Sequence, residues 1–268
     1  MTGTARAADG LVPARPNPAR LYDYLLGGRS TYRVDQVAGD RGIAAVPDIR
    51  LGVAAQRDAL GRVVRFLVRD AGVGQLLDIG TGLPTRENVH QVAQRFNPAA
   101  RVVYVDNDPV ILSYAKALLA DNPGTVAAEG DIRAPAEIVA NPVVRGHLDW
   151  TEPIGLLLCG ILYHVMDSDG PQEIIASLVD ALPSGSYVFI HHLLASDDPL
   201  TDTLKAFLIQ TFGRIQFRTL DQVRELFRGL EFVEPGLVSV PDWRPEGPVS
   251  PELSAVGRLA CAGVARKP

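Results

Sequence analysis

The sequence predicts an α/β protein built on a Rossmann-like, doubly wound sheet of seven strands, mostly parallel, with an antiparallel edge hairpin and N-terminal helices over the crevice. From about residue 73 onward, short apolar runs alternate with segments of helical spacing. The runs are apolar on both faces, as buried parallel strands are. We therefore expect an extended arm at 1–18 and one domain at 19–268, divided into a helical lid (19–72) and a core (73–268).

The segment before the sheet is expected to be helical. Residues 1–18 carry three prolines and no apolar periodicity, which is typical of an extended arm. Gly27 and Gly28 are a plausible end for the first helix. Helices are expected over 20–26, 32–45 and 53–70.

Repeated strand and helix units follow, and their order predicts a parallel sheet. Strands are expected over 75–79, 101–105, 125–128, 154–158 and 186–191. Helices are expected over 86–96, 109–120, 134–140 and 171–182. In the tail, helices over 200–212 and 220–227 precede two strands, 232–240 and 258–264, which could pair at an antiparallel edge.

A glycine pair stands at the turn between the first strand and its helix. Gly80 and Gly82 can adopt positive φ without strain and leave the backbone open to a ligand. Ligands of doubly wound sheets bind beyond the carboxyl ends of the strands, facing the amides at the start of the next helix. We expect a ligand that contains a nucleoside here.

Acidic residues follow the next two strands. Asp106, 26 residues beyond Gly80, can accept both hydroxyls of a ribose. Asp131 can accept an exocyclic amine, and Ile132 can pack on a purine face. Each residue alone is equally compatible with a solvated cap or turn. Together, at regular intervals in one sheet, they favour adenosine.

These residues resemble the motifs of a known protein family. The sequence LLDIGTG at 76–82, with Asp106 and Asp131, resembles the class I S-adenosylmethionine-dependent methyltransferases. YDYLLGG at 22–28, DIGTGLPT at 78–85, VYVDNDP at 103–109, and PGL at 235–237 with WRP at 243–245 look like an actinobacterial methyltransferase family long catalogued as a domain of unknown function. The likeness covers the chain from about Arg15 onward and carries little information about the acceptor.

The resemblance implies S-adenosylmethionine as cofactor and a role for each motif residue. Asp106 would face the ribose hydroxyls, Asn107 the adenine side, and Asp131 with Ile132 the adenine edge and face. Cys159 and Gly160 would lie near the sulfonium and its methyl group. Tyr24 and the Gly27–Gly28 turn would close over the cofactor. Asp78, Gly80, Thr81 and Gly82 would face its methionine and ribose end.

Other chemistries fit the motifs less well. Thr85 stands where a nicotinamide-binding G-x-G-x-x-G turn has its third glycine, so NAD-dependent hydride transfer is only the second interpretation. LCGILY at 158–163 differs from the Asn/Asp-Pro-Pro-Tyr/Phe pattern of enzymes that methylate amines of DNA bases. The sequence has no G-x-S-x-G elbow of a serine hydrolase.

A general base is optional for methyl transfer, because positioning alone can achieve much of an in-line displacement. His164, five residues past Cys159, is the best-placed candidate, and a packed or solvated histidine is an equal alternative. Of His191 and His192, at most one should line the pocket, because neighbouring side chains in a strand point to opposite faces. His90 is expected on a helix surface and His147 in a loop.

Composition and charge indicate which kinds of partner and setting to expect for this protein. A net charge of −5 argues against an extended nucleic-acid surface and favours a small-molecule acceptor, with a protein side chain as the next candidate. Cys159 and Cys261 show no metal-ligand or disulfide spacing, which suggests a reducing cytoplasm. The most apolar run, 154–165, is too short to span a membrane. Two hypotheses remain, a methyltransferase and a protein that binds S-adenosylmethionine or S-adenosylhomocysteine without turnover; the sequence does not indicate an oligomeric state.

Overall fold

One sheet organises the protein in the computed structural model, which describes residues 13–84, 87–119 and 121–268. Its strand order is β3-β2-β1-β4-β5-β8-β6, and β7 also pairs with β8. Strands β1 to β5 are parallel, and β8 runs antiparallel to β5. The strands are β1 (Gln75–Ile79), β2 (Arg101–Asp106), β3 (Thr125–Glu129), β4 (Gly155–Cys159), β5 (Tyr187–Leu193), β6 (Glu231–Phe232), β7 (Val238–Ser239) and β8 (Ala260–Arg266).

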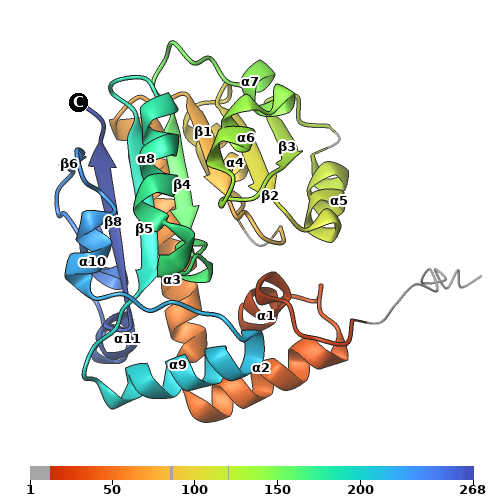
Figure 1. Ribbon diagram of the computed structural model, residues 1–268, viewed down its shortest axis with the longest axis vertical. Helices are drawn as coiled ribbons and strands as arrows, with labels where there is room; N and C mark the ends of the chain where they lie inside the picture. The colour runs from red at the N-terminus through yellow and green to blue at the C-terminus, as the bar shows by residue number, and fades with distance from the viewer. Residues whose placement is uncertain (1–12, 85–86, 120) are drawn as a thin grey trace, which may run out of the picture.

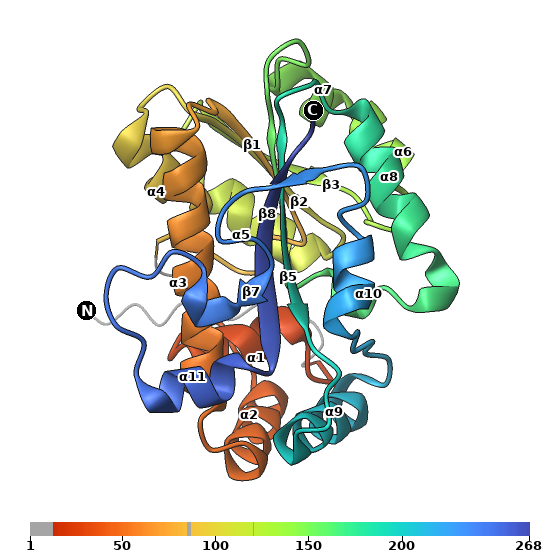
Figure 2. The ribbon, with the colours of Figure 1, turned by 90° about the vertical axis from the view of Figure 1, so that its left-hand side faces the viewer.

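Helices cover both faces of this sheet, which confirms the predicted Rossmann-like class (Figure 2). The α-helices are α1 (Pro18–Leu25), α2 (Arg33–Ala45), α3 (Ile49–Arg65), α4 (Val89–Phe96), α5 (Pro109–Leu118), α6 (Pro135–Ala140), α7 (Pro142–His147), α8 (Pro171–Ala181), α9 (Pro199–Phe212), α10 (Leu220–Glu225) and α11 (Pro251–Gly257). The short helical turns are η1 (Phe66–Asp70, a π turn), η2 (Leu162–His164), η3 (Asp167–Asp169) and η4 (Val240–Asp242).

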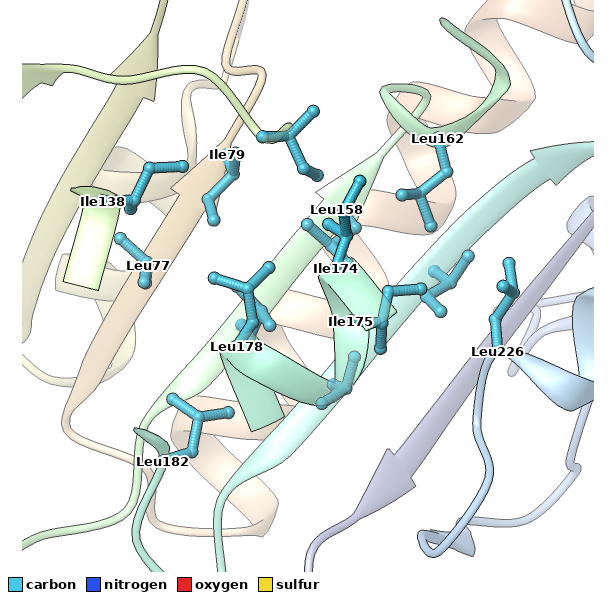
Figure 3. Close-up of a cluster of buried hydrophobic side chains, with 14 of the residues drawn as sticks. Leu77, Ile79, Ile138, Leu158, Leu162, Ile174, Ile175, Leu178, Leu182 and Leu226 are labelled. Atoms are coloured by element: carbon cyan, nitrogen blue, oxygen red, sulfur yellow. The ribbon is translucent and has the colours of Figure 1, made fainter. Parts of the chain in front are cut away.

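The two-sided burial of the strands follows from their sequence. In β1, Leu77 and Ile79 pack on the face covered by α6 and α8 (Figure 3). Leu76 packs on the opposite face with α3. All three side chains are almost fully buried, and burial of each contributes about 2 kcal/mol to stability. Because both faces are covered, no position of the strand can be polar without a special reason. The two polar residues of β1 are Gln75, whose side chain hydrogen-bonds to the backbone of Asp149 and Glu152, and Asp78.

A helical lid lies at the carboxyl ends of the strands, where Figure 1 shows α1, α2 and α9. Arg20 of α1 forms a buried ion pair with Asp35 of α2, with 2.7 Å between Nε and Oδ2. Phe207 of α9 packs where a side chain at Gly42 of α2 would otherwise stand. The lid therefore combines two N-terminal helices with one from the C-terminal third. The third expected helix, α3, begins among these helices at Ile49 and then packs along one face of the sheet.

The remaining differences from expectation lie mainly in the tail. The strand expected over 232–240 is two short strands, β6 and β7, separated by a turn at Pro235 and Gly236. Proline has no amide proton to donate to a sheet ladder, so a continuous strand cannot form there. Helices α7 and α11 were not expected, and the sheet has eight strands by this division. Most of the expected arm, 1–18, lies outside the described residues.

The described helices include none with both the length and the apolar character required to cross a membrane.

Candidate active site

A cleft of 340 Å³ lies where β1, β2 and β4 end, between the strand ends, the loop after β3 and helices α1 and α3. This volume is within the usual range for small-molecule sites. Of the expected site residues, Tyr24 does not line it. The others do: Asp78, Gly80, Thr81, Gly82, Asp106, Asn107, Asp131, Ile132, Cys159, Gly160 and His164.

The glycine turn adopts the backbone conformation expected of it. Gly80 and Gly82 have φ of +76° and +65°. A Cβ at Gly80 would stand 2.7 Å from Ile161, so this glycine is required by close packing of the loop after β4 and not only by a ligand. A Cβ at Gly82 would stand 3.6 Å from Ala19, which places this turn directly beneath α1 of the lid.

Asp106 holds this turn from the end of β2. Its Oδ2 accepts a hydrogen bond from the Gly82 amide at 3.0 Å, and its Oδ1 accepts one from the Asp108 amide at 3.0 Å. Burial raises the pKa of Asp106, and the backbone amides oppose that shift. Each carboxylate oxygen keeps a second lone pair, so the side chain can still accept hydroxyl donors from the cleft.

Asp131 is oriented by two side chains. Arg133 donates to both of its oxygens, and Asn107 Nδ2 donates to Oδ2 at 3.1 Å. These hydrogen bonds, with Arg133 contributing most, lower the pKa of Asp131 to about 2. Asp131 is therefore an anion at neutral pH. Beside it, Ile132 is buried and offers an apolar surface to the same cleft.

Asp78 is a carboxylate within the sheet itself. It is 4% exposed, and Thr81 Oγ1 donates to its Oδ2 at 3.3 Å. Burial raises its pKa to about 7, and the nearby Arg57 guanidinium partly opposes this rise. A cation brought into the cleft beside Asp78 would favour the ionised form.

Several enzyme classes share this fold and a cleft at the strand ends, and comparison with known proteins distinguishes them. A family model described as S-adenosyl methyltransferase matches residues 4–268. The chain belongs to the S-adenosyl methyltransferase family. This confirms the resemblance drawn from the sequence motifs, and it decides against hydride transfer as the activity.

Similar solved structures agree. This methyltransferase shares 38% identity with a protein of Thermobifida fusca provisionally named a methyltransferase, over 94% of this chain and 95% of that one, with a TM-score of 0.90. It shares 37% identity with a DUF574 family protein of Streptomyces avermitilis, over 95% and 98% of the two chains, with a TM-score of 0.90. A more distant relative is a 3-hydroxy-5-methyl-1-naphthoate 3-O-methyltransferase of Streptomyces sahachiroi, 28% identical over 54% of this chain. The match spans only 39% of that enzyme.

The lid residue at the methyltransferase cleft is Tyr22, whereas Tyr24 was expected. Tyr24 donates a 2.6 Å hydrogen bond from its hydroxyl to Asp40 and packs against Gly39, so it joins α1 to α2. One helical turn of 3.6 residues cannot direct positions 22 and 24 to the same side. The Gly27–Gly28 turn ends α1, as expected, but it does not line the cleft.

Helix α3 contributes two polar cleft residues that the sequence motifs did not reveal, Gln56 and Arg57. Gln56 Nε2 lies 3.6 Å from Cys159 Sγ, and a Cβ at Gly160 would stand 2.6 Å from the same nitrogen. Burial raises the pKa of Cys159 to about 12, so this thiol is neutral and not a nucleophile. Both α3 residues lie in an ordinary amphipathic pattern, which carries no signal of a site.

His164 lines the cleft from η2. Its ring packs against Tyr163, with 4.7 Å between centroids, and against Phe212 of α9 at 6.4 Å. Burial lowers the pKa of His164 to about 4, so the imidazole is neutral at pH 7.

The adjacent histidines of β5 point to opposite faces, as expected. His191 lines an apolar chamber next to the cleft. His192 accepts a hydrogen bond from Arg218 at 2.8 Å. Arg218 is 1% exposed and also donates to the carbonyls of Leu162 and Val165, so it holds the loop that carries His164.

Two histidine expectations were wrong. His90 is not on a helix surface: it is 6% exposed, and its Nδ1 lies 2.9 Å from the Tyr104 hydroxyl, because this side of α4 faces the sheet. His147 is the last residue of α7, not a loop residue, and its Nε2 lies 3.0 Å from the Gly124 carbonyl oxygen.

Proposed function

We propose that this protein transfers the methyl group of S-adenosylmethionine to a hydroxyl of a small molecule. The observation that carries the proposal is the convergence, in one cleft, of functional groups from four strand ends. Asp131 and Ile132 would take the adenine, Asp106 the ribose hydroxyls, and Asp78 with Thr81 the methionine end. Cys159 and Gly160 would lie near the sulfonium.

The charges around the cleft fit this cofactor. Of the described residues, four aspartates (Asp78, Asp106, Asp108, Asp131) and two arginines (Arg57, Arg133) line it, which leaves an excess of negative charge. S-adenosylmethionine carries a sulfonium, an ammonium and one carboxylate, so it has a net positive charge. A dinucleotide with two phosphates would be repelled by the same set. Arg57, near Asp78, is suited to the cofactor's carboxylate.

His164 is proposed as the group that receives the acceptor's proton. When bound, S-adenosylmethionine supplies an electrophilic methyl group on a sulfonium. As the carbon–oxygen bond forms and the carbon–sulfur bond breaks, the hydroxyl proton becomes far more acidic than an imidazolium. A neutral ring with a pKa of about 4 can therefore still accept it. Between pH 6 and 8 the rate should vary little with this group.

A small acceptor is favoured because His164 borders both the cleft and a smaller apolar chamber. The net charge of −5 also disfavours nucleic acid as acceptor. We place the reaction in the cytoplasm, where Cys159 and Cys261 would stay reduced; both are free thiols.

Two measurements test the proposal. Calorimetry should show binding of S-adenosylhomocysteine and none of NAD; absence of sulfur-nucleoside binding would refute it. Labelled methyl from S-adenosylmethionine should then appear in a low-molecular-weight fraction of a cell extract, and His164→Asn should lower this rate about 100-fold or more while leaving cofactor affinity unchanged. Binding without any labelled product would favour the non-catalytic alternative.

A further inference from the structure

A second, smaller cavity adjoins the cofactor cleft. This chamber has a volume of 120 Å³ and lies between the lid helices α1 and α9, helices α3 and α11, and the ends of β5 and β8. Five residues border both cavities: Pro18, Tyr22, Gln56, Tyr163 and His164. A molecule in the chamber would therefore meet the cofactor at Tyr163 and His164.

The walls of the chamber are almost entirely apolar. They include Leu204, Leu208 and Phe212 of α9 and Ile49 and Val53 from α3. In the described part of the chain, no aspartate, glutamate, lysine or arginine lines it. A charged molecule placed there would lose its hydration without an ionic partner, which is strongly unfavourable. The chamber therefore selects for a neutral occupant.

The volume sets the size of that occupant. An engineered apolar cavity of about 150 Å³ in another protein holds one benzene molecule. At 120 Å³, this chamber has room for a single six-membered ring. A larger molecule would extend beyond the chamber.

One polar atom in the chamber wall has no hydrogen-bond partner among the described residues. His191 is 2% exposed, and its Nδ1 is unpaired within that part of the chain, although buried polar atoms are nearly always paired. Burial, with the neighbouring His192, lowers the pKa of His191 to about 3, so the ring is neutral. A neutral imidazole can pair with either a donor or an acceptor, according to its tautomer.

We propose that the chamber is the acceptor site, and that the acceptor is a neutral molecule of about one aromatic ring with two polar groups: a hydroxyl that meets His164 and receives the methyl, and a second group hydrogen-bonded to His191 Nδ1. The proposal rests on the proposed function. It adds the chemical class of the acceptor, and it makes His191 a residue that determines specificity.

The test uses the full chain saturated with S-adenosylhomocysteine, whose binding is verified first. The probes are the three dihydroxybenzenes, which differ only in the spacing of two hydroxyls, together with toluene and 4-hydroxybenzoate. Binding is measured by calorimetry or ligand-observed NMR. At least one dihydroxybenzene should bind ten times more tightly than toluene, and 4-hydroxybenzoate should bind more weakly than every dihydroxybenzene.

Two variants locate the binding. His191→Leu should weaken the preferred dihydroxybenzene fivefold to tenfold, as loss of one hydrogen bond does, and should leave toluene unchanged. Leu208→Trp should fill the chamber and abolish binding of every ring probe with unchanged affinity for S-adenosylhomocysteine. Ile209→Trp, at the next position of α9 but exposed, is the matched control and should alter neither.

The outcomes separate the two proposals. If S-adenosylhomocysteine does not bind, the proposed function fails, and this inference with it. If it binds but no dihydroxybenzene exceeds toluene, or 4-hydroxybenzoate binds equally well, the acceptor class is wrong and the cofactor assignment stands. If His191→Leu does not fold, Leu208→Trp and its control still decide whether the chamber is the site.

Discussion

Asp78→Asn is expected to abolish a pH dependence of cofactor binding that the wild-type protein shows near neutrality. Asp78 is buried at the cleft, and burial raises its pKa to about 7. In the proposed complex its carboxylate lies near the methionine end, where the ammonium favours the ionised form. Below pH 7 the aspartic acid must therefore lose a proton before the cofactor binds.

The pKa sets the size of this effect. If only ionised Asp78 supports tight binding, affinity follows the ionised fraction, which at pH 6 is about one eleventh. Affinity for S-adenosylhomocysteine should then be about tenfold weaker at pH 6 than at pH 8, a difference of about 1.4 kcal/mol. At pH 7, about half a proton should be released for each ligand bound.

Calorimetry in two buffers with different heats of ionisation measures both the affinity and the proton release. Asp78→Asn should bind with a constant affinity and release no proton. Asp40→Asn, on α2 and outside the residues lining the cleft, carries the same change of charge and should behave as wild type. A wild-type affinity that is flat between pH 6 and 8, with no proton released, would refute this account of Asp78.

The unliganded protein should show the opposite dependence. Because the folded-state pKa of Asp78 lies above its unfolded value, the stabilisation is complete below about pH 4 and is lost as the pH rises through 7. The whole pKa shift of Asp78 corresponds to about 4 kcal/mol in the free energy of unfolding. The stability of Asp78→Asn relative to wild type, measured by urea unfolding, should therefore rise between pH 5 and pH 8.

Three further substitutions test the architecture of the site. Asp106→Ala should weaken S-adenosylhomocysteine binding about 100-fold, because it removes the acceptor for the ribose hydroxyls and the acceptor of the Gly82 amide. Calorimetry at pH 7.5 measures this affinity. A loss of affinity below threefold would contradict the role assigned to Asp106. Gly80→Ala should lower the free energy of unfolding, measured with urea, by about 2–4 kcal/mol, because Gly80 has positive φ and a Cβ there would contact Ile161. Gly61→Ala is the control: it lies in α3 with no described atom within 4 Å of the added Cβ, and it should raise the free energy of unfolding by up to about 1 kcal/mol. Arg218→Met should lower the free energy of unfolding by about 3–5 kcal/mol, because it removes the donor to the buried Leu162 and Val165 carbonyls. The exposed Arg228→Met is the control and should lower it by less than about 0.5 kcal/mol. Equal effects of the two variants would show that the buried network contributes little to stability.

The cofactor cleft could be largely predicted because its residues follow strand ends. In a parallel sheet, the carboxyl ends of neighbouring strands meet at one edge, so Asp106 and Asp131 converge even though 25 positions separate them. Strand periodicity likewise placed His191 and His192 on opposite faces. These arguments need only local pattern and the handedness of the chain connections.

For residues on the lid helices, the local sequence predicts less well which side chains face the cleft. Tyr22 and Tyr24 are both aromatic residues of α1, and nothing in their local sequence says which one faces the strand ends. Helix α3 was expected to lie over the crevice, but it packs along the sheet and brings Gln56 and Arg57 to the cleft from the side. His90 was misplaced for the same reason, since the buried side of α4 depends on its position over Tyr104.

The sequence by itself determined the alternation of strands and helices, the glycine turn and the two carboxylates at the strand ends, because each depends on backbone conformation or on the position of a residue relative to its own strand. Only the tertiary structure decided the acceptor chamber. Its walls come from α1, α3, α9, α11 and β5, segments separated by more than two hundred residues at the extremes, and their apolar side chains look in the sequence like any other core positions. A cavity remains where such side chains do not fill the space between the packed elements. Whether they fill it depends on how whole helices pack together.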